Sequence, residues 1–186
     1  MSAKVNHKTE KNNILSIKIA LKRYDMKEIV FIRHAKSSWN YDVSDRERPL
    51  KKRGINDSHL VSSNFKQFNF APDAIFTSPA VRARKTCKIF TNNLNISNYD
   101  IKIKEDIYDF GGNRLINFIK SLDNNLNNIM IFGHNHALTS IVNTFGSKYI
   151  DNVPTSGLIH LRFDIDNWID IKKGITVLTV FPRDLK

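Results

Sequence analysis

The chain has 186 residues, enough for one domain with a sizeable buried core. Hydrophobic residues make up 41% and charged residues 25%, a balance typical of water-soluble globular proteins, and no apolar stretch approaches the roughly 20 residues of a membrane-spanning helix. The single cysteine, Cys87, excludes an intrachain disulfide and a cysteine-based metal site, and it is compatible with the cytoplasmic location that we expect.

The formal net charge of +11 favours an anionic partner, such as nucleic acid, an anionic membrane or a phosphorylated substrate. The chain has no dense arginine run and no interleaving of basic with aromatic residues, the patterns used by single-strand nucleic-acid binders. We therefore expect neither nucleic acid nor a membrane as the partner of this protein.

Residues 1–25 differ from the rest of the chain, because they are polar and basic and lack a clear strand pattern. The piece "ILSIKIALK" is typical of a short amphipathic helix, but it is too short and interrupted for a signal-peptide core. Met26 stands immediately before "KEIVFIRHA", where we expect a compact domain to begin. We therefore divide the chain into an N-terminal extension, residues 1–25, which need not be ordered, and one domain, residues 26–186.

From residue 28 onward, strand-like and helix-like patterns alternate. Short runs rich in β-branched and aromatic residues predict strands, and apolar residues at helical spacing predict helices. The predicted strands cover residues 28–32, 73–78, 100–104, 128–133, 157–166 and 174–181, and the predicted helices cover residues 52–68, 80–94, 113–123 and 136–145. In the first helix, one apolar face is expected to hold Ile55, Leu60, Phe65 and Phe68.

The alternation of strands and helices indicates an α/β fold with a mainly parallel sheet between two layers of helices, a three-layer α/β/α sandwich. The last two strands follow each other with only the apolar segment 167–171 between them. A helical crossover is therefore missing at that point, and we expect an antiparallel edge there.

Polar residues that could take part in catalysis or ligand binding follow three of the predicted strands. Arg33 and His34 follow "EIVFI", Arg82 follows "DAIFTSPA", and His134 follows "NIMIFG". In an open α/β sheet, ligands bind in the crevice outside the carboxyl ends of the strands, so these residues are expected to meet at one rim. Any one of them alone would be ordinary at a solvated strand end, and it is their convergence that predicts a site.

Two arginines and two histidines in one pocket suit a phosphoryl group. An arginine guanidinium is a planar fork of donors that matches phosphate oxygens. If His34 attacks phosphorus through a ring nitrogen, the transfer is split into two easier steps. Arg33, Arg82 and His134 would then stabilise charge on the phosphoryl oxygens. No carboxylate–histidine spacing around these residues suggests metal ligands, so we predict neither a metal nor another cofactor.

The chain resembles the histidine phosphatase superfamily, whose first strand ends in Arg-His-Gly or Arg-His-Ala, and within it most closely the SixA-type phosphohistidine phosphatase branch. The similar segments occur in the same order as in that branch. They are "VFIRHAKSSW", "SDRERPLKKRG", "IFTSPAVRARKT", "IFGHNHAL", "VPTSGLIHLRFD" and "FPRDL". The resemblance runs from about Met26 to the end of the chain and implies a phosphoglycerate mutase-like fold.

The resemblance implies a role for each matching residue. His34 matches the nucleophile that accepts the phosphoryl group. The other members of the phosphate pocket are matched by Arg33, Arg82 and His134, and further phosphate-holding positions are matched by Ser37 and Asn40. For the general acid, the segment "EDIYDFGG" offers three carboxylates, of which Asp109 matches best. The resemblance implies hydrolysis of a phosphate compound, such as a histidine-phosphorylated protein, by a monomer.

Two other functions stay open. One is a phosphoglycerate mutase-like phosphotransfer, which the short chain disfavours because mutases need extra segments to retain the intermediate. The other is a domain that recognises phosphorylated partners with little turnover. Among further residues near the motifs, Arg48, Thr155 and Ser156 are candidates for the lining of the pocket. Trp39 is expected in the pocket wall and Lys36 at its mouth, and His136 is placed where its side chain could reach the pocket. His59, His160, Cys87 and Trp168 are expected to be structural.

Overall fold

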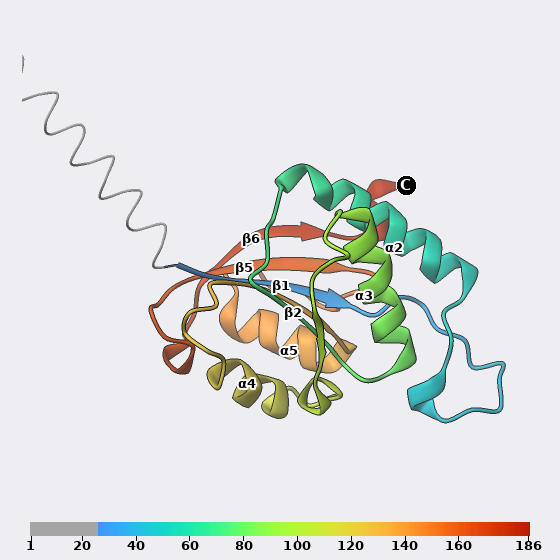
Figure 1. The fold of residues 1–186 in the computed structure, drawn as a ribbon, viewed down its shortest axis with the longest axis horizontal. Helices are drawn as coiled ribbons and strands as arrows, with labels where there is room; N and C mark the ends of the chain where they lie inside the picture. Colours follow the sequence, from blue (N-terminus) through green and yellow to red (C-terminus); the bar gives the residue numbers. More distant parts are fainter. Residues whose placement is uncertain (1–25) are drawn as a thin grey trace, which may run out of the picture.

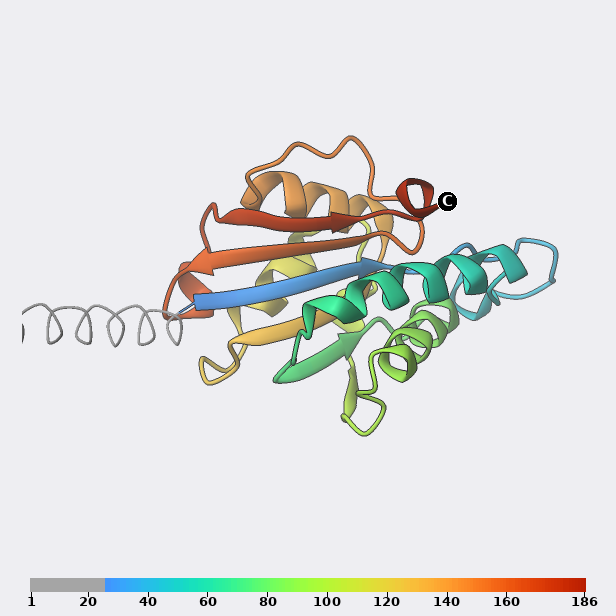
Figure 2. The same ribbon diagram turned by 90° about the horizontal axis from the view of Figure 1, so that it is seen from above.

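The computed structural model describes residues 26–186, and the predictions for residues 1–25 lie outside this range. The described residues form a six-stranded sheet with the strand order β3-β2-β4-β1-β5-β6 (Figure 1). The strands are β1 (Met26–Arg33), β2 (Ala74–Thr77), β3 (Ile101–Ile103), β4 (Asn128–Gly133), β5 (Leu158–Asp164) and β6 (Ile175–Val180). β1 therefore lies near the middle of the sheet, as Figure 2 also shows.

The four strands from β3 to β1 pair in parallel, whereas β5 pairs antiparallel with both β1 and β6. The carboxyl ends of parallel strands lie at the same side of a sheet. The residues that follow β1, β2 and β4 therefore lie at one rim. The loop between β1 and the next helix projects beyond this rim (Figure 2). The mainly parallel sheet with an antiparallel edge confirms the expected topology.

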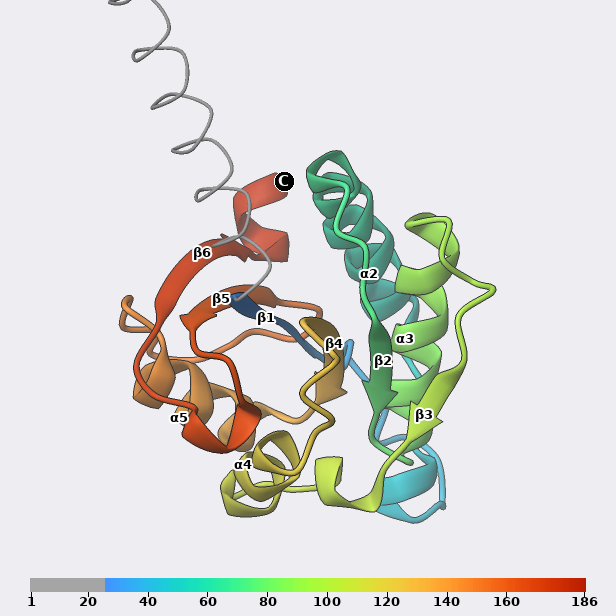
Figure 3. The same cartoon turned by 60° about the vertical axis from the view of Figure 1, so that its left-hand side comes forward.

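Four helices cover the two faces of the sheet. They are α2 (Lys52–Phe65), α3 (Val81–Asn93), α4 (Asn113–Lys120) and α5 (Asn135–Phe145). Figure 3 shows α2 and α3 on one side of the sheet and α4 and α5 on the other. The predicted three-layer α/β/α sandwich is thus confirmed.

The central strand explains why two layers of helices are needed. Consecutive side chains of a strand point to opposite faces, and Ile29, Val30, Phe31 and Ile32 of β1 are all fully buried. Ile29 and Phe31 belong to the core under α4 and α5, and Val30 and Ile32 belong to the core under α2 and α3. Each such side chain contributes roughly 1.5–3 kcal/mol when it is buried.

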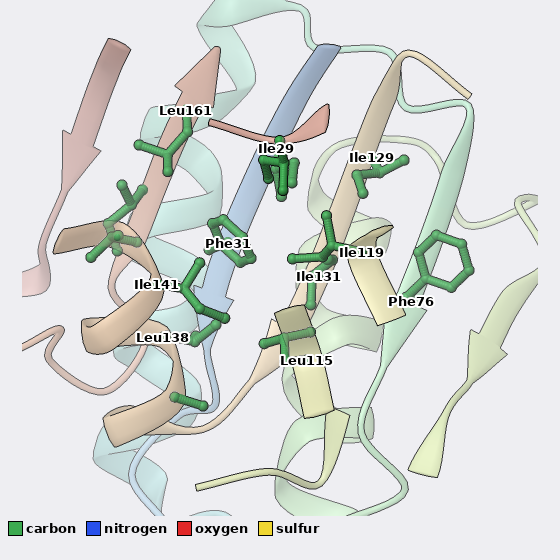
Figure 4. Close-up of a cluster of buried hydrophobic side chains, with 14 of the residues drawn as sticks. Ile29, Phe31, Phe76, Leu115, Ile119, Ile129, Ile131, Leu138, Ile141 and Leu161 are labelled. Atoms are coloured by element: carbon green, nitrogen blue, oxygen red, sulfur yellow. The ribbon is translucent and has the colours of Figure 1, made fainter. Parts of the chain in front are cut away.

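The core on the α4 and α5 side is drawn in Figure 4. Its labelled members include Leu115 and Ile119 from α4 and Leu138 and Ile141 from α5, which lie over strand residues such as Phe31. This packing fixes the beginning of α5, which follows β4 directly through His134. The position of that residue in the rim is therefore set by the core.

The structure corrects the apolar face that was predicted for α2. Phe65 is buried, but Ile55 and Phe68 are exposed and Leu60 is half-buried. The buried face instead holds Gly54, Asp57, Ser58, Val61, Ser62 and Phe65. Small and polar side chains fit there because Ser58 and Ser62 donate hydrogen bonds to carbonyl groups one turn earlier in the helix, at 2.9 and 2.7 Å.

The segment 167–171 between the last two strands includes a 3₁₀ turn, Trp168–Asp170, which buries Trp168 completely and confirms its structural role. Its indole Nε1 donates a 2.8 Å hydrogen bond to the carbonyl oxygen of Leu126. Within residues 26–186, no helix has both the length and the apolar character needed to cross a membrane.

Candidate active site

A pocket of about 330 Å³ opens at the rim where β1, β2 and β4 end. It is lined by Arg33, His34, Lys36, Ser37, Trp39, Asp45, Arg48, Arg82, Phe110, Asn135, His136 and Thr155. The lining carries four cationic side chains and one carboxylate, so its charge suits an anionic ligand. Two other cavities, one of about the same volume and one larger, contain none of the predicted site residues.

His34 is held with one ring nitrogen free. Its Nδ1 lies 2.8 Å from the carbonyl oxygen of Ala35, and because a carbonyl only accepts, Nδ1 carries the proton. The Nε2 lone pair is therefore available for attack. Burial lowers the pKa of His34 well below the usual value, and the nearby charges of His134, Arg82 and Arg33 act in the same direction. The ring is thus neutral and nucleophilic at neutral pH.

Three arginines surround the pocket with unsatisfied donors. Within the described part of the chain, the buried side-chain nitrogens that lack a hydrogen-bond partner are the Nε atoms of Arg33, Arg48 and Arg82. Buried donors are normally paired, so three unpaired guanidinium nitrogens around one pocket point to an anionic acceptor as their partner. Arg33 also donates from Nη1 to the carbonyl oxygen of Val153 at 2.6 Å. Burial lowers the pKa of Arg33 to about 10, which leaves it charged at neutral pH.

The loop after His34 is fixed against the segment that precedes α2. Ser37 forms an isolated antiparallel bridge with Leu50, and the N–H of Lys51 donates to the carbonyl oxygen of Lys36 at 2.8 Å. Thr86 of α3 accepts a hydrogen bond from the N–H of Ala35 at 2.9 Å. These contacts place Ser37, which is buried, in the pocket lining as predicted.

His134 lies beside His34 but behind the pocket surface. The two ring centroids are 5.1 Å apart, and His134 is 1% exposed and absent from the lining. Arg82 donates from Nη2 to its Nδ1 at 3.3 Å, so the proton is on Nε2, which donates to Ser78 Oγ at 2.8 Å. Burial and the charge of Arg82 lower the pKa of His134 to about 3. His134 is therefore a neutral partner that orients Arg82.

The sequence analysis missed Asp45, which lines the pocket. Its carboxylate accepts hydrogen bonds from Arg82 Nη2 at 2.8 Å and from the Tyr108 hydroxyl at 2.7 Å, and it pairs with Arg48 Nη2 at 2.8 Å. Burial works to raise the pKa of Asp45, but the hydrogen bonds from Tyr108 and Arg82 outweigh it and lower this pKa to about 2. The signal in the sequence was a carboxylate within the basic loop "SDRERPLKKRG".

The structure does not bring Asp109 or Asn40 into the pocket lining. Asp109 instead accepts hydrogen bonds from the N–H groups of Gly111, Gly112 and Leu115 at 2.9, 2.9 and 3.1 Å, so it caps the beginning of α4. Burial works to raise the pKa of Asp109, but these N–H groups outweigh it and lower the pKa. The predicted role as general acid therefore has no support in the geometry, because this carboxylate is ionised and turned to the helix.

The remaining candidates divide into pocket and scaffold. Thr155, His136 and Lys36 line the pocket. Arg48 both lines it and pairs with Asp45, and its guanidinium lies 3.5 Å from the ring centroid of Trp39, which forms a wall. Arg48 is thus a lining residue whose guanidinium is held by a salt bridge within the same loop.

Four other residues belong to the scaffold. The Ser156 hydroxyl lies 3.1 Å from that of Ser58, away from the lining. His160 is buried against Glu28, with 2.6 Å between Nε2 and Oε2, and His59 contacts Asn93 on the surface. Burial raises the pKa of Cys87 to about 12, so its thiol is unreactive.

Within residues 26–186, no group of three or more histidine, cysteine or acidic side chains is arranged to hold a metal ion. The amino end of α5 adds positive potential to the pocket instead, since Asn135 and His136 of its first turn line it and no side chain caps this end. What the site offers an anion is thus three guanidinium groups and a helix amino end.

The chain is similar in sequence or in fold to several known proteins. An uncharacterized protein of Mycobacterium tuberculosis is 27% identical over 166 residues, which cover 82% of this chain and all of that protein. A 2,3-bisphosphoglycerate-dependent phosphoglycerate mutase of Actinobacillus pleuropneumoniae is 37% identical over 71 residues, 37% of this chain and 31% of the mutase. The structure of the protein histidine phosphatase SixA complexed with tungstate is 19% identical, with a TM-score of 0.71 over 86% of this chain and 99% of that one.

The fold is therefore that of the SixA-type proteins, as the sequence segments predicted. Residues 29–111, which span the strand before Arg33 and His34, the loop with Asp45 and the segment around Arg82, match the family model of the histidine phosphatase superfamily, branch 1. The same residues build most of the pocket. The part of the chain that carries Arg33, His34, Asp45 and Arg82 is thus similar to the histidine phosphatase superfamily, and the fold is similar to that of a SixA phosphatase.

Proposed function

We propose that this protein is a metal-independent phosphatase that hydrolyses phosphate compounds through a covalent phosphohistidine on His34. The observation that carries the proposal is the state of His34, a buried neutral imidazole with a free Nε2 beside three guanidinium groups whose Nε atoms lack partners. A nucleophile next to fixed cations is what phosphoryl transfer requires, since catalysis rests on positioning and charge stabilisation.

The reaction would proceed in two displacements. The phosphoryl oxygens bind to Arg33, Arg48 and Arg82, which places phosphorus in front of Nε2 of His34. Nε2 forms a bond to phosphorus while the bond to the leaving group breaks, and Nδ1–H stays bonded to the Ala35 carbonyl, which stabilises the positive ring. Water then attacks phosphorus, the P–N bond breaks, and phosphate leaves with neutral His34 restored.

The surroundings of the pocket favour a large substrate, such as a histidine-phosphorylated protein. Trp39 and Phe110 both line the pocket and are exposed, Trp39 by 72%, and Tyr41, two residues after Trp39, is exposed as well. Exposed aromatic residues beside a site are common at protein contacts. The name of the SixA relative, protein histidine phosphatase, points the same way for that protein.

The segment shared with the mutase favours a second candidate, transfer of the phosphoryl group to a phosphoglycerate instead of water. The two functions differ in what leaves the enzyme. A phosphatase releases inorganic phosphate from 3-phosphoglycerate or an aryl phosphate, whereas a mutase interconverts phosphoglycerates and releases little phosphate.

An assay with an aryl phosphate tests the proposal. We expect turnover that a metal chelator leaves unchanged, that vanadate inhibits competitively, and that His34→Ala reduces by at least about 10³-fold, because the covalent route is removed. The matched control is His59→Ala, since His59 lies on the surface away from the pocket. Turnover that persists in His34→Ala would refute the nucleophile, and binding of phosphate without any turnover would identify a recognition domain.

The substrate class needs a separate measurement. A histidine-phosphorylated phosphotransfer domain and a phosphoserine peptide are supplied at equal concentrations, and loss of phosphate is followed over time. We expect the phosphohistidine to be lost faster, and equal rates would contradict the preference for phosphohistidine.

A further inference from the structure

The leaving group needs a proton when its bond to phosphorus breaks, and neither carboxylate near the site can supply one. Asp109 is outside the pocket and accepts three backbone hydrogen bonds. Asp45 lines the pocket, but Arg82, Arg48 and Tyr108 hold it as an ionised acceptor. A general acid must carry the proton and lie within reach of the leaving atom, so both carboxylates fail one of these conditions.

The two histidines already described are also unsuitable. Nδ1–H of His34 donates to the Ala35 carbonyl, and Nε2 of His34 is the attacking atom. Nε2–H of His134 donates to Ser78, behind the pocket surface, and Nδ1 of His134 accepts from Arg82. Neither ring has a proton directed to the place where the leaving group would lie.

Besides the arginines, two lining side chains can act as cationic acids, Lys36 and His136; the hydroxyl groups of Ser37 and Thr155 are far weaker acids. A histidine exchanges its proton near neutral pH, whereas a lysine holds its proton far more tightly. His136 also has a fixed place. It follows Asn135 in the first turn of α5, whose next residues, Ala137 and Leu138, are buried in the core, so residue 136 is presented outward at the pocket.

We propose that His136 is a catalytic residue, the general acid that protonates the leaving group at this pocket. The proposal rests on the phosphatase function proposed above. As Nε2 of His34 bonds to phosphorus, the bond to the leaving oxygen or nitrogen breaks, and the proton on the His136 ring moves to that atom. Neutral His136 then takes a proton from the water that attacks the phosphohistidine, which restores both histidines and balances the cycle.

The charged groups that line the pocket repel a cationic ring until an anionic substrate is bound. Across the pocket from α5, the lining contributes the carboxylate of Asp45 and the cations of Arg33, Arg48, Arg82 and Lys36. In the proposed reaction Arg33, Arg48 and Arg82 bind the phosphoryl group, so the negative charge of the bound substrate offsets their repulsion of His136.

Leaving-group dependence tests the proposal. Values of kcat/KM are measured for wild type and His136→Gln with aryl phosphates of graded phenol acidity, from nitrophenyl to phenyl, and with an alkyl phosphate. A good leaving group departs without a proton, so we expect less than about threefold loss with nitrophenyl phosphate. With phenyl and alkyl phosphates we expect a loss of about 10²-fold or more, because general acid catalysis is worth that much. Turnover of nitrophenyl phosphate also verifies that the variant is folded.

The matched control is Lys36→Gln, which removes the other side chain that can act as a cationic acid and is expected to lower kcat/KM equally for all substrates. A uniform effect of His136→Gln across the series would overturn the assignment, and so would a graded effect of Lys36→Gln alone. His34→Ala separates this test from the proposed function, because it should abolish turnover of every substrate. If it does not, the nucleophile is wrong, whereas a uniform His136→Gln effect with an inactive His34→Ala refutes only the acid.

Discussion

Asp45 places a negative charge inside a pocket built for an anion. It accepts hydrogen bonds from Arg82 and Tyr108 and pairs with Arg48, so two of the three arginines are held by a carboxylate before any substrate arrives. Such a contact keeps long side chains in place, and it also opposes the binding of phosphate through charge repulsion. We infer that Asp45 lowers the affinity of the pocket for phosphate and so speeds the release of the product.

We therefore predict that Asp45→Asn tightens the binding of inorganic phosphate. The amide keeps the size of the side chain but removes its charge. The inhibition constant for phosphate should therefore fall about three- to tenfold, the effect expected when one partly solvent-exposed negative charge near the phosphate is removed. Product inhibition assays measure this directly. Weaker phosphate binding in Asp45→Asn would show that holding the arginines in position matters more than the repulsion.

Asp109 is the residue whose role changed most between sequence and structure. We predict that Asp109→Ala lowers the free energy of unfolding by about 1–3 kcal/mol, because three N–H groups at the start of α4 lose their acceptor. Turnover per folded molecule should stay within about threefold of wild type, since the residue is outside the pocket. Denaturant unfolding and the aryl phosphate assay together measure this. A drop of about 10²-fold in kcat at unchanged stability would instead restore its role as the acid.

At the scale of single residues, the sequence correctly placed the site residues that lie at or directly after the end of a strand. Arg33 and His34 continue β1, and His134 follows β4, so the sheet alone determines their place. Asp45 and Asp109 lie on longer connections, where side-chain direction depends on contacts with residues far along the chain. No local pattern distinguishes a carboxylate that binds Arg82 from one that caps a helix, so the sequence analysis missed Asp45 and did not predict the contacts of Asp109 with the start of α4.

At the scale of elements, α2 makes a close contact with the loop after His34 that substitutions can test. Gly54 lies in the first turn of α2, directly against the backbone of Lys36, two residues after His34. A methyl group at this position would lie 2.7 Å from the Lys36 nitrogen and nearer still to its carbonyl oxygen. The absence of a side chain at Gly54 therefore sets how closely α2 approaches the loop.

We predict that Gly54→Ala destabilises the protein by about 1–3 kcal/mol and lowers kcat/KM, because the loop that carries His34 and Ser37 must shift. Thermal unfolding and the aryl phosphate assay measure the two effects. The control is Gly111→Ala, where an added methyl would meet only the Asp109 side chain, at 3.7 Å. Equal behaviour of the two variants would contradict the close approach.

The same helix explains the error in its predicted face. The helical period was right for Phe65, but apolar residues were assumed to be the buried ones, and Ile55 and Phe68 are exposed. Close packing of α2 against the loop selects small residues such as Gly54 and Ser58, whose hydroxyl bonds within the helix. Close approach of backbone segments is a tertiary property, and a hydrophobic pattern cannot report it.

At the scale of the whole molecule, the fold and the site follow from the same sheet. Near-continuous apolar strands required helices on both faces, and parallel strands in the order β2-β4-β1 required their ends to meet. This is why the architecture and the meeting of Arg33, His34, Arg82 and His134 were predictable from the sequence. The position of His134 behind the pocket and the contacts of Asp45 depend on side-chain packing that only the structure specifies.

The most direct test of this account is detection of the covalent intermediate. The protein is mixed rapidly with a radiolabelled aryl phosphate that has a good leaving group and is quenched with alkali, in which a phosphohistidine survives, and the labelled peptide is identified. We predict label on His34 that appears with the first release of the phenol, is lost in acid, and is absent in His34→Asn. Label that persists in His34→Asn, or steady turnover by the wild type with neither label nor an initial burst of phenol, would contradict the central role of His34.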